Sequence, residues 1–130
     1  MMKVTLSLLC LFFSVTTAMA AAKLDRLMGE HQGTGSGGAC KLSFVKKGHE
    51  LNLWFMATSS ASRALFDVRR ELERQLSRDS GSIVLSHDRD SMYDATIRLT
   101  ILLNRETGLP LSMSGTVEGL MHETVDCNFQ

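Results

Sequence analysis

The stretch CKLSFVKKGHELNLWF, residues 40–55, decides the fold class. Apolar residues occupy every second position on both sides of the central KKGH segment, where a glycine favours a turn. Residues that alternate in this way lie on one face of a strand, and two such runs joined by a short turn are typical of an antiparallel hairpin. We therefore predict a hairpin with one buried face between Cys40 and Phe55.

The spacing of apolar residues changes after this hairpin. They now recur at three- to four-residue intervals, at Leu65, Val68, Leu72 and Leu76. This spacing predicts one amphipathic helix. It begins near Ser62 or at Asp67, since either side chain can cap a helix, and it ends before Gly81.

Alternating segments return in the second half of the chain. They cover residues 82–87, 94–104, 109–119 and 120–129. Together with the hairpin they predict a mainly β (α+β) fold, an antiparallel curled sheet or small barrel of about five to six strands. The single helix is inserted after the first hairpin and packs on the sheet.

The first twenty residues have the features of a secretory signal peptide. Lys3 precedes an apolar run from Leu6 to Val15, and small residues then end in Ala18-Met19-Ala20, an A-x-A cleavage pattern. Cys10 is removed with this peptide. No later segment approaches the roughly 20 apolar residues that a spanning helix needs. We expect an exported protein, periplasmic or secreted, without a transmembrane segment.

Two cysteines remain after cleavage, Cys40 and Cys127. Cys40 shares its strand face with Leu42 and Phe44, and Cys127 shares its face with the apolar residues around it, so both sulfur atoms point toward the core. An oxidising compartment favours their pairing. We predict a structural Cys40–Cys127 disulfide that ties the first strand to the last.

The expected domain organisation is simple. Residues 1–20 are the signal peptide, residues 21–38 a flexible N-terminal lead-in, and residues 39–130 a single β-rich domain. The lead-in contains Gly33, Gly35 and Gly38 at the spacing of a dinucleotide-binding turn. Such a turn follows a strand and opens a helix, whereas here a strand follows, so we interpret the glycines as a flexible loop.

Motifs for catalysis or metal binding are weak. The segment HDRDSMYD gathers His87, Asp88, Asp90 and Asp94. It lacks the glycine and the final glutamate of a calcium-binding loop, so a polar turn is favoured over a weak calcium site. The histidines lack zinc-site spacing and no serine lies in a G-x-S-x-G elbow. We expect a protein that is not an enzyme and has no cofactor or metal.

Glu123 allows two interpretations. Alternation places its side chain on the same face as Val125 and Cys127, where a buried carboxylate would need a partner. The favoured alternative is a bulge around residues 119–122, which would turn Glu123 outward.

The predicted helix also carries a row of arginines opposite its apolar face. Its members are Arg63, Arg70, Arg74 and Arg78. They are candidates for binding an anionic lipid, polysaccharide or acidic protein. The favoured alternative is an ordinary solvated helix face, because Asp67, Glu71 and Glu73 lie nearby.

The charge balance adds little, since 14 lysines and arginines match 14 acidic residues. It gives no general attraction to nucleic acid. The leading functional hypothesis is an exported, non-enzymatic domain that binds a protein partner or an anionic envelope component. A small barrel that carries an apolar ligand is the alternative, and a hydrolytic enzyme ranks last.

Overall fold

The computed structural model describes residues 21–57, 63–78, 80–87, 95–119 and 122–129. The expected signal peptide and the acidic residues of the HDRDSMYD segment, Asp88 to Asp94, lie outside them. The predicted hairpin is confirmed. It consists of β2 (Gly38–Lys47) and β3 (Glu50–Met56), whose register pairs Leu42 with Phe55 and Phe44 with Leu53.

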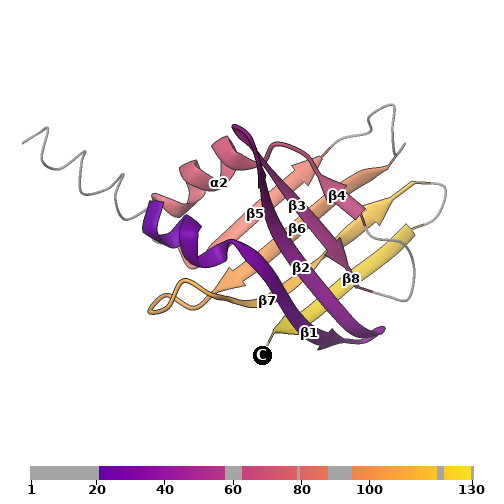
Figure 1. Cartoon of the computed structure of the whole chain (residues 1–130). Coiled ribbons are helices and arrows are strands. Elements are labelled where there is room, and N and C mark those ends of the chain that lie inside the picture. The colour runs from indigo at the N-terminus through magenta and orange to yellow at the C-terminus, as the bar shows by residue number, and fades with distance from the viewer. Residues whose placement is uncertain (1–20, 58–62, 79, 88–94, 120–121, 130) are drawn as a thin grey trace, which may run out of the picture.

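The described residues form one antiparallel sheet of eight strands rather than five or six. The sheet curls into a nearly closed barrel (Figure 1). Its strand order is β4-β3-β2-β1-β8-β7-β6-β5. The remaining strands are β1 (Gly29–Gly35), β4 (Arg63–Leu65), β5 (Ser82–His87), β6 (Thr96–Leu103), β7 (Pro110–Glu118) and β8 (His122–Phe129). The coarse fold prediction is therefore confirmed and the strand count was wrong.

One uncounted strand is β1, which lies in the stretch that we interpreted as a flexible loop. It pairs along its whole length with β2, and at Gly33 and Thr34 it also pairs with β8. A Cβ atom on Gly33 would lie 2.0 Å from the carbonyl oxygen of Asn128, and one on Gly35 would lie 2.0 Å from that of Asp126. The glycines therefore allow two backbones to approach closely, a role that glycine also has inside strands.

A second helical segment, residues 21–27, precedes β1. Leu24 and Leu27 on this segment are buried in the core. The Leu27 carbonyl lies 2.8 Å from Nε2 of His31 and so links the segment to β1. This helix lies within the expected lead-in, where we predicted no helix.

The predicted amphipathic helix is α2 (Arg69–Leu76), which starts later than either expected cap. Ser62 lies outside the described residues. Asp67 adopts a left-handed backbone (φ 51°) and donates its N–H to Oδ1 of Asn52 at 2.9 Å. The Val68 N–H donates to the Leu51 carbonyl at 2.8 Å. The start was wrong because Leu65, although spaced for a helix, belongs to β4, which pairs with β3, and Val68 is the cap residue just before α2.

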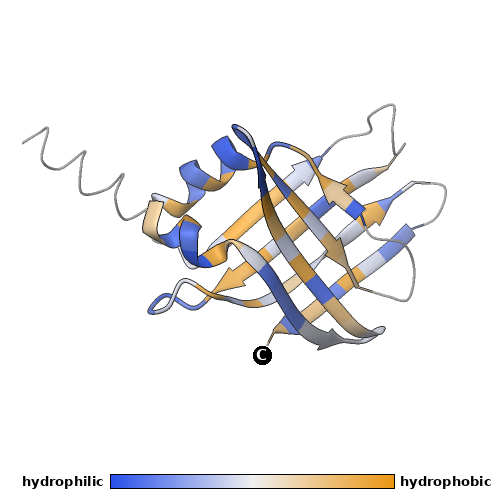
Figure 2. Ribbon diagram, in the orientation of Figure 1, coloured by the Kyte–Doolittle hydropathy of each residue, from blue (hydrophilic) through white to orange (hydrophobic). Residues whose placement is uncertain are grey.

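Inward-facing residues of β2, β3, β5, β6, β7 and β8 fill the barrel. Apolar bands cross neighbouring strands in Figure 2, in agreement with the predicted alternation. The largest fully buried side chains include Phe44, Leu42, Leu53, Ile97 and Ile101, and Leu72 of α2 is equally buried. Burial of this apolar surface is the main favourable contribution to folding.

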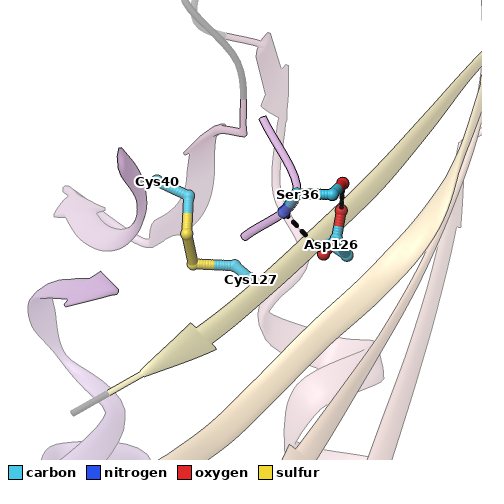
Figure 3. The surroundings of a disulfide bond; sticks show 4 residues. All are labelled: Ser36, Cys40, Asp126 and Cys127. Carbon is cyan, nitrogen blue, oxygen red and sulfur yellow. Dashed lines mark hydrogen bonds between the residues drawn. A yellow bond between two sulfur atoms is a disulfide. The ribbon is translucent and has the colours of Figure 1, made fainter. Parts of the chain in front are cut away.

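The predicted disulfide between Cys40 and Cys127 is present, with Cα atoms 5.9 Å apart (Figure 3). It joins the second strand, β2, to the last, β8, because β1 precedes β2 in the chain; in the sheet β1 lies between the two. Beside it, Ser36 donates its backbone N–H to Oδ2 of Asp126 at 2.9 Å and its hydroxyl to Oδ1. The β1–β8 junction, which has only two paired positions, is thus reinforced by a covalent bond and by side-chain hydrogen bonds.

Candidate functional site

The opposite side of the barrel is open. Strands β4 and β5 stand at the two ends of the sheet order and are not paired with each other. Seven successive antiparallel pairings separate them, so they run in opposite directions. We call the gap between β4 and β5 the open seam. Exposed strand edges are sites where a sheet can accept another strand.

Helix α2 fills one part of the open seam. Leu72 and Leu76 point into the core from this helix. The side chain of Gln75 meets the edge of β5, where its Nε2 donates to the Val84 carbonyl at 2.6 Å. The Val84 N–H donates to Oε1 of Gln75 at 2.7 Å. One side-chain amide thus supplies the donor and the acceptor that a neighbouring strand would offer.

The Gln75 amide is held in place by its neighbours on the same helix. Its Nε2 also donates to Oε1 of Glu71 at 2.8 Å. Arg74 in turn donates to both carboxylate oxygens of Glu71. The hydrogen bonds from Arg74, and then that from Gln75, lower the pKa of Glu71 below its ordinary value of 4.5. Glu71 is therefore ionised at neutral pH and remains an acceptor for the amide.

A groove of about 420 Å³ lies between β4 and β5. Its apolar lining is Leu65, Phe66, Val68, Val84 and Leu85. Its polar lining is Asp67, Glu71, Ser86 and His87. Leu65 and Leu85 are buried, whereas Phe66 and Val84 are 38% and 46% exposed. The groove therefore has an apolar floor, exposed apolar side chains and two carboxylates, and its volume is within the range of binding sites.

An aromatic pair continues the apolar surface beside the groove. The rings of Trp54 and Phe66 meet edge to face, with centroids 6.0 Å apart. Both side chains are 38% exposed. Large, partly exposed aromatic residues are enriched at protein interfaces, where they add contact area at low entropic cost.

The structure separates the four arginines that the sequence placed in one row. Arg63 lies on β4, outside the helix, and its Nη2 is 3.2 Å from Oε2 of Glu123 on β8. Arg70 and Arg74 are on α2, and Arg78 follows it. Arg74 is engaged by Glu71, whereas Arg70 and Arg78 are exposed. Anion binding by these residues stays a prediction.

The bulge that was expected to turn Glu123 outward does not occur among the described residues. Strands β7 and β8 pair in unbroken register from Ser112 with Asn128 to Glu118 with His122. Glu123 keeps the parity of Val125 and Cys127, and its side chain is 40% exposed. It lies at the beginning of β8, where the side chain of Arg63 reaches it, so the carboxylate has a partner without a bulge.

The HDRDSMYD segment lies outside the described residues beyond His87. In the described part of the chain no three metal-binding side chains come together. No helix there is long and apolar enough to cross a membrane.

No protein-family model, no curated protein and no solved structure matches this chain.

Sequence reasoning missed the residues that form the open seam. Val84 stands at an outward position of an alternating strand, and Phe66 stands between two residues that we assigned to one helix face. Gln75 adjoins Leu76 and looks like an ordinary solvated residue. The outward position of the apolar Val84 was the one signal available in the sequence. A single exposed apolar residue is common on protein surfaces and so does not identify a site.

Proposed function

We propose that this protein is an exported, non-enzymatic module that binds a polypeptide partner at the open seam. One observation carries the proposal: β4 and β5, at the two ends of the sheet, are not paired with each other and flank a groove with exposed Phe66 and Val84. Proteins recognise extended peptides at such edges, with backbone hydrogen bonds for affinity and pockets for specificity. The Cys40–Cys127 disulfide is compatible with the oxidising compartment that export implies.

A polypeptide fits the described residues better than an apolar ligand inside the barrel. The interior is occupied by Phe44, Leu42, Leu53 and other fully buried side chains. Small barrels of eight strands are wide enough for little more than their own side chains. The groove, in contrast, lies at the surface and combines apolar and polar groups.

The groove also suits a polypeptide better than an anionic component. Asp67 and Glu71 line it, and two members of the arginine row, Arg63 and Arg74, are engaged by Glu123 and Glu71. A carboxylate-lined groove repels a polyanion at close range. The arginine row is therefore the weaker of the two candidate surfaces.

A displayed library of linear peptides, each about ten residues long and without fixed structure, tests the proposal. We expect the native protein to retain a subset of peptides and the Val84→Lys variant to lose them, because a lysine disrupts the apolar side of the groove. Val45→Lys is the matched control, since Val45 on β2 is also 46% exposed and does not line the groove. Equal losses in both variants, or no retained peptide, would reject the proposal.

A further inference from the structure

The backbone groups along the free edge of β5 indicate how a partner would bind, and this inference rests on the proposed function. The N–H and C=O of Val84 are both hydrogen-bonded to the Gln75 side chain. These two backbone groups therefore point away from β6, toward the free edge of β5. In antiparallel strands this direction alternates, so Ser82 and Ser86 also direct their backbone groups to the free edge. The Ser82 carbonyl accepts the Ser80 hydroxyl at 3.1 Å.

Ser86 differs from its two neighbours along this edge. Within the described residues no side chain bonds its N–H and C=O as Gln75 bonds those of Val84. Ser86 also lines the groove, which Ser82 does not. The edge is therefore capped by side chains at one end and uncapped where the groove lies.

We infer that the partner is an extended segment that adds to β5 as an antiparallel strand, pairing first with Ser86. Gln75 occupies the next pairing position and must leave before the segment can pair with Val84. An added strand antiparallel to β5 is parallel to β4, because β4 and β5 run in opposite directions. β5 is the stronger template, since it has six residues against three in β4 and antiparallel pairing is slightly more stable.

The lining of the groove defines the side chains of this segment. Residues of an added strand alternate between the floor, formed by Leu65 and Leu85, and the outer side, where Phe66 and Val84 are exposed. Glu71 is engaged by Arg74, whereas the exposed Asp67 has no ion pair in the described part of the chain. The segment therefore carries apolar residues for the floor and a lysine or arginine that meets Asp67.

A second copy of this chain fits these requirements poorly. The edge strands that it could insert are β4, with three residues, and β5, whose pairing with a second β5 would require Gln75 to leave in both copies. Strand β5 has the sequence SIVLSH, which offers no lysine or arginine to Asp67. Self-association is therefore an outcome that the experiment must be able to detect.

The test uses one synthetic peptide chosen by the displayed library and the full mature protein. N-methylation of alternate backbone amides of the peptide should weaken binding roughly tenfold, because it removes strand hydrogen bonds and keeps the side chains. Gln75→Met should strengthen binding roughly tenfold, because it frees the Val84 backbone. Gln32→Met is the control, since Gln32 is an exposed glutamine on β1 away from the seam.

Asp67→Asn is the matching test of charge, because asparagine also tolerates the left-handed backbone of this position. It should weaken binding roughly threefold and reduce the salt dependence.

The outcomes separate the inference from the proposed function. If N-methylation of alternate amides of the peptide leaves binding unchanged and Gln75→Met binds like the native protein, strand addition is rejected even though the seam binds peptides. An unchanged affinity in Asp67→Asn rejects the basic side chain. If no peptide is retained, or if sedimentation shows that the protein fills its own seam as a dimer, the proposed function and the inference fall together.

Discussion

The β1–β8 junction and the open seam both interrupt the regular ladder of the barrel, yet their local structures differ. At the first, Gly33 and Gly35 bring two backbones together, and the Cys40–Cys127 disulfide and the Ser36–Asp126 hydrogen bonds hold them. At the second, the Gln75 side chain makes the hydrogen bonds to Val84 that a neighbouring strand would make. A groove remains open beside Ser86. The difference indicates that the first junction is locked by covalent and polar contacts, and it supports the proposal that the second binds a partner.

Removal of the disulfide should have the largest effect on this comparison. A Cys40→Ala, Cys127→Ala double variant loses a link across 87 residues. The chain-entropy model gives a loss of about 4.5 kcal/mol in unfolding free energy. Urea unfolding of the variant and the native protein measures it. Two alkylated thiols in the non-reduced native protein, or a loss below about 1 kcal/mol, would contradict the role assigned to the closed junction.

Gly33→Ala should have the next largest effect. The added Cβ would lie 2.0 Å from the Asn128 carbonyl oxygen, so β1 and β8 must separate. We expect a loss of about 2 kcal/mol, typical of overpacking.

Gly48→Ala is the comparison variant for this steric effect. Gly48 has a positive φ of 63° and nothing within 4 Å of the added atom, so only backbone strain of about 1 kcal/mol applies. Equal losses of thermal stability in the two variants would mean that the close approach of β1 and β8 has no energetic importance.

The Ser36–Asp126 interaction predicts a smaller, pH-dependent effect at the same junction. The hydrogen bonds from the hydroxyl and backbone N–H of Ser36 lower the pKa of Asp126 below its ordinary value of 3.8. The ionised carboxylate therefore stabilises the fold above about pH 3.8, and this contribution disappears as the pH falls through the lowered pKa.

Asp126→Asn measures this contribution. The melting temperature of the native protein should exceed that of the variant at pH 7, and the gap should narrow toward pH 2. A constant gap between pH 7 and pH 2 would show that the charge of Asp126 is irrelevant.

The smallest effect is expected from the arginines near α2. An Arg70→Gln, Arg78→Gln variant changes two exposed residues outside the groove lining. We expect unfolding free energy to change by less than about 0.5 kcal/mol and peptide retention to stay unchanged. Attachment to anionic vesicles is measured in parallel, with Arg74→Gln as the control. If the double variant loses vesicle binding and the Arg74→Gln control keeps it, the arginines and not the open seam are the binding surface.

The features predictable from sequence follow the period of the apolar residues. Alternation identified β2, β3 and the later strands, and the parity of Cys40 and Cys127 predicted their disulfide. Strand β1 was missed because its sequence GEHQGTG has no apolar alternation, and its glycines serve an approach to β8 that only the assembled sheet reveals. The helix start was misplaced because Leu65 satisfies helical spacing although it lies in β4, and only Val68, the cap residue, adjoins the helix.

The candidate site was less predictable than the fold, for a physical reason. Its defining contact joins Gln75 to the backbone of Val84, and a side chain that bonds a backbone nine residues away leaves no periodic pattern. Arg63 likewise lies apart from the helix because it pairs with Phe55 of β3, and its side chain meets Glu123 of β8, 60 residues away in sequence. Contacts of this kind are set by topology and not by local spacing.

Amide hydrogen exchange at Ser86 and Val84, followed by NMR with and without the selected peptide, tests the central claim most directly. In the free protein we predict slow exchange at Val84, whose N–H is bonded to Gln75, and fast exchange at Ser86. The peptide should slow exchange at Ser86 by roughly tenfold or more. Protection of Ser86 equal to that of Val84 in the free protein, or exchange at Ser86 that the bound peptide leaves unchanged, would contradict a seam that is open and accepts a strand.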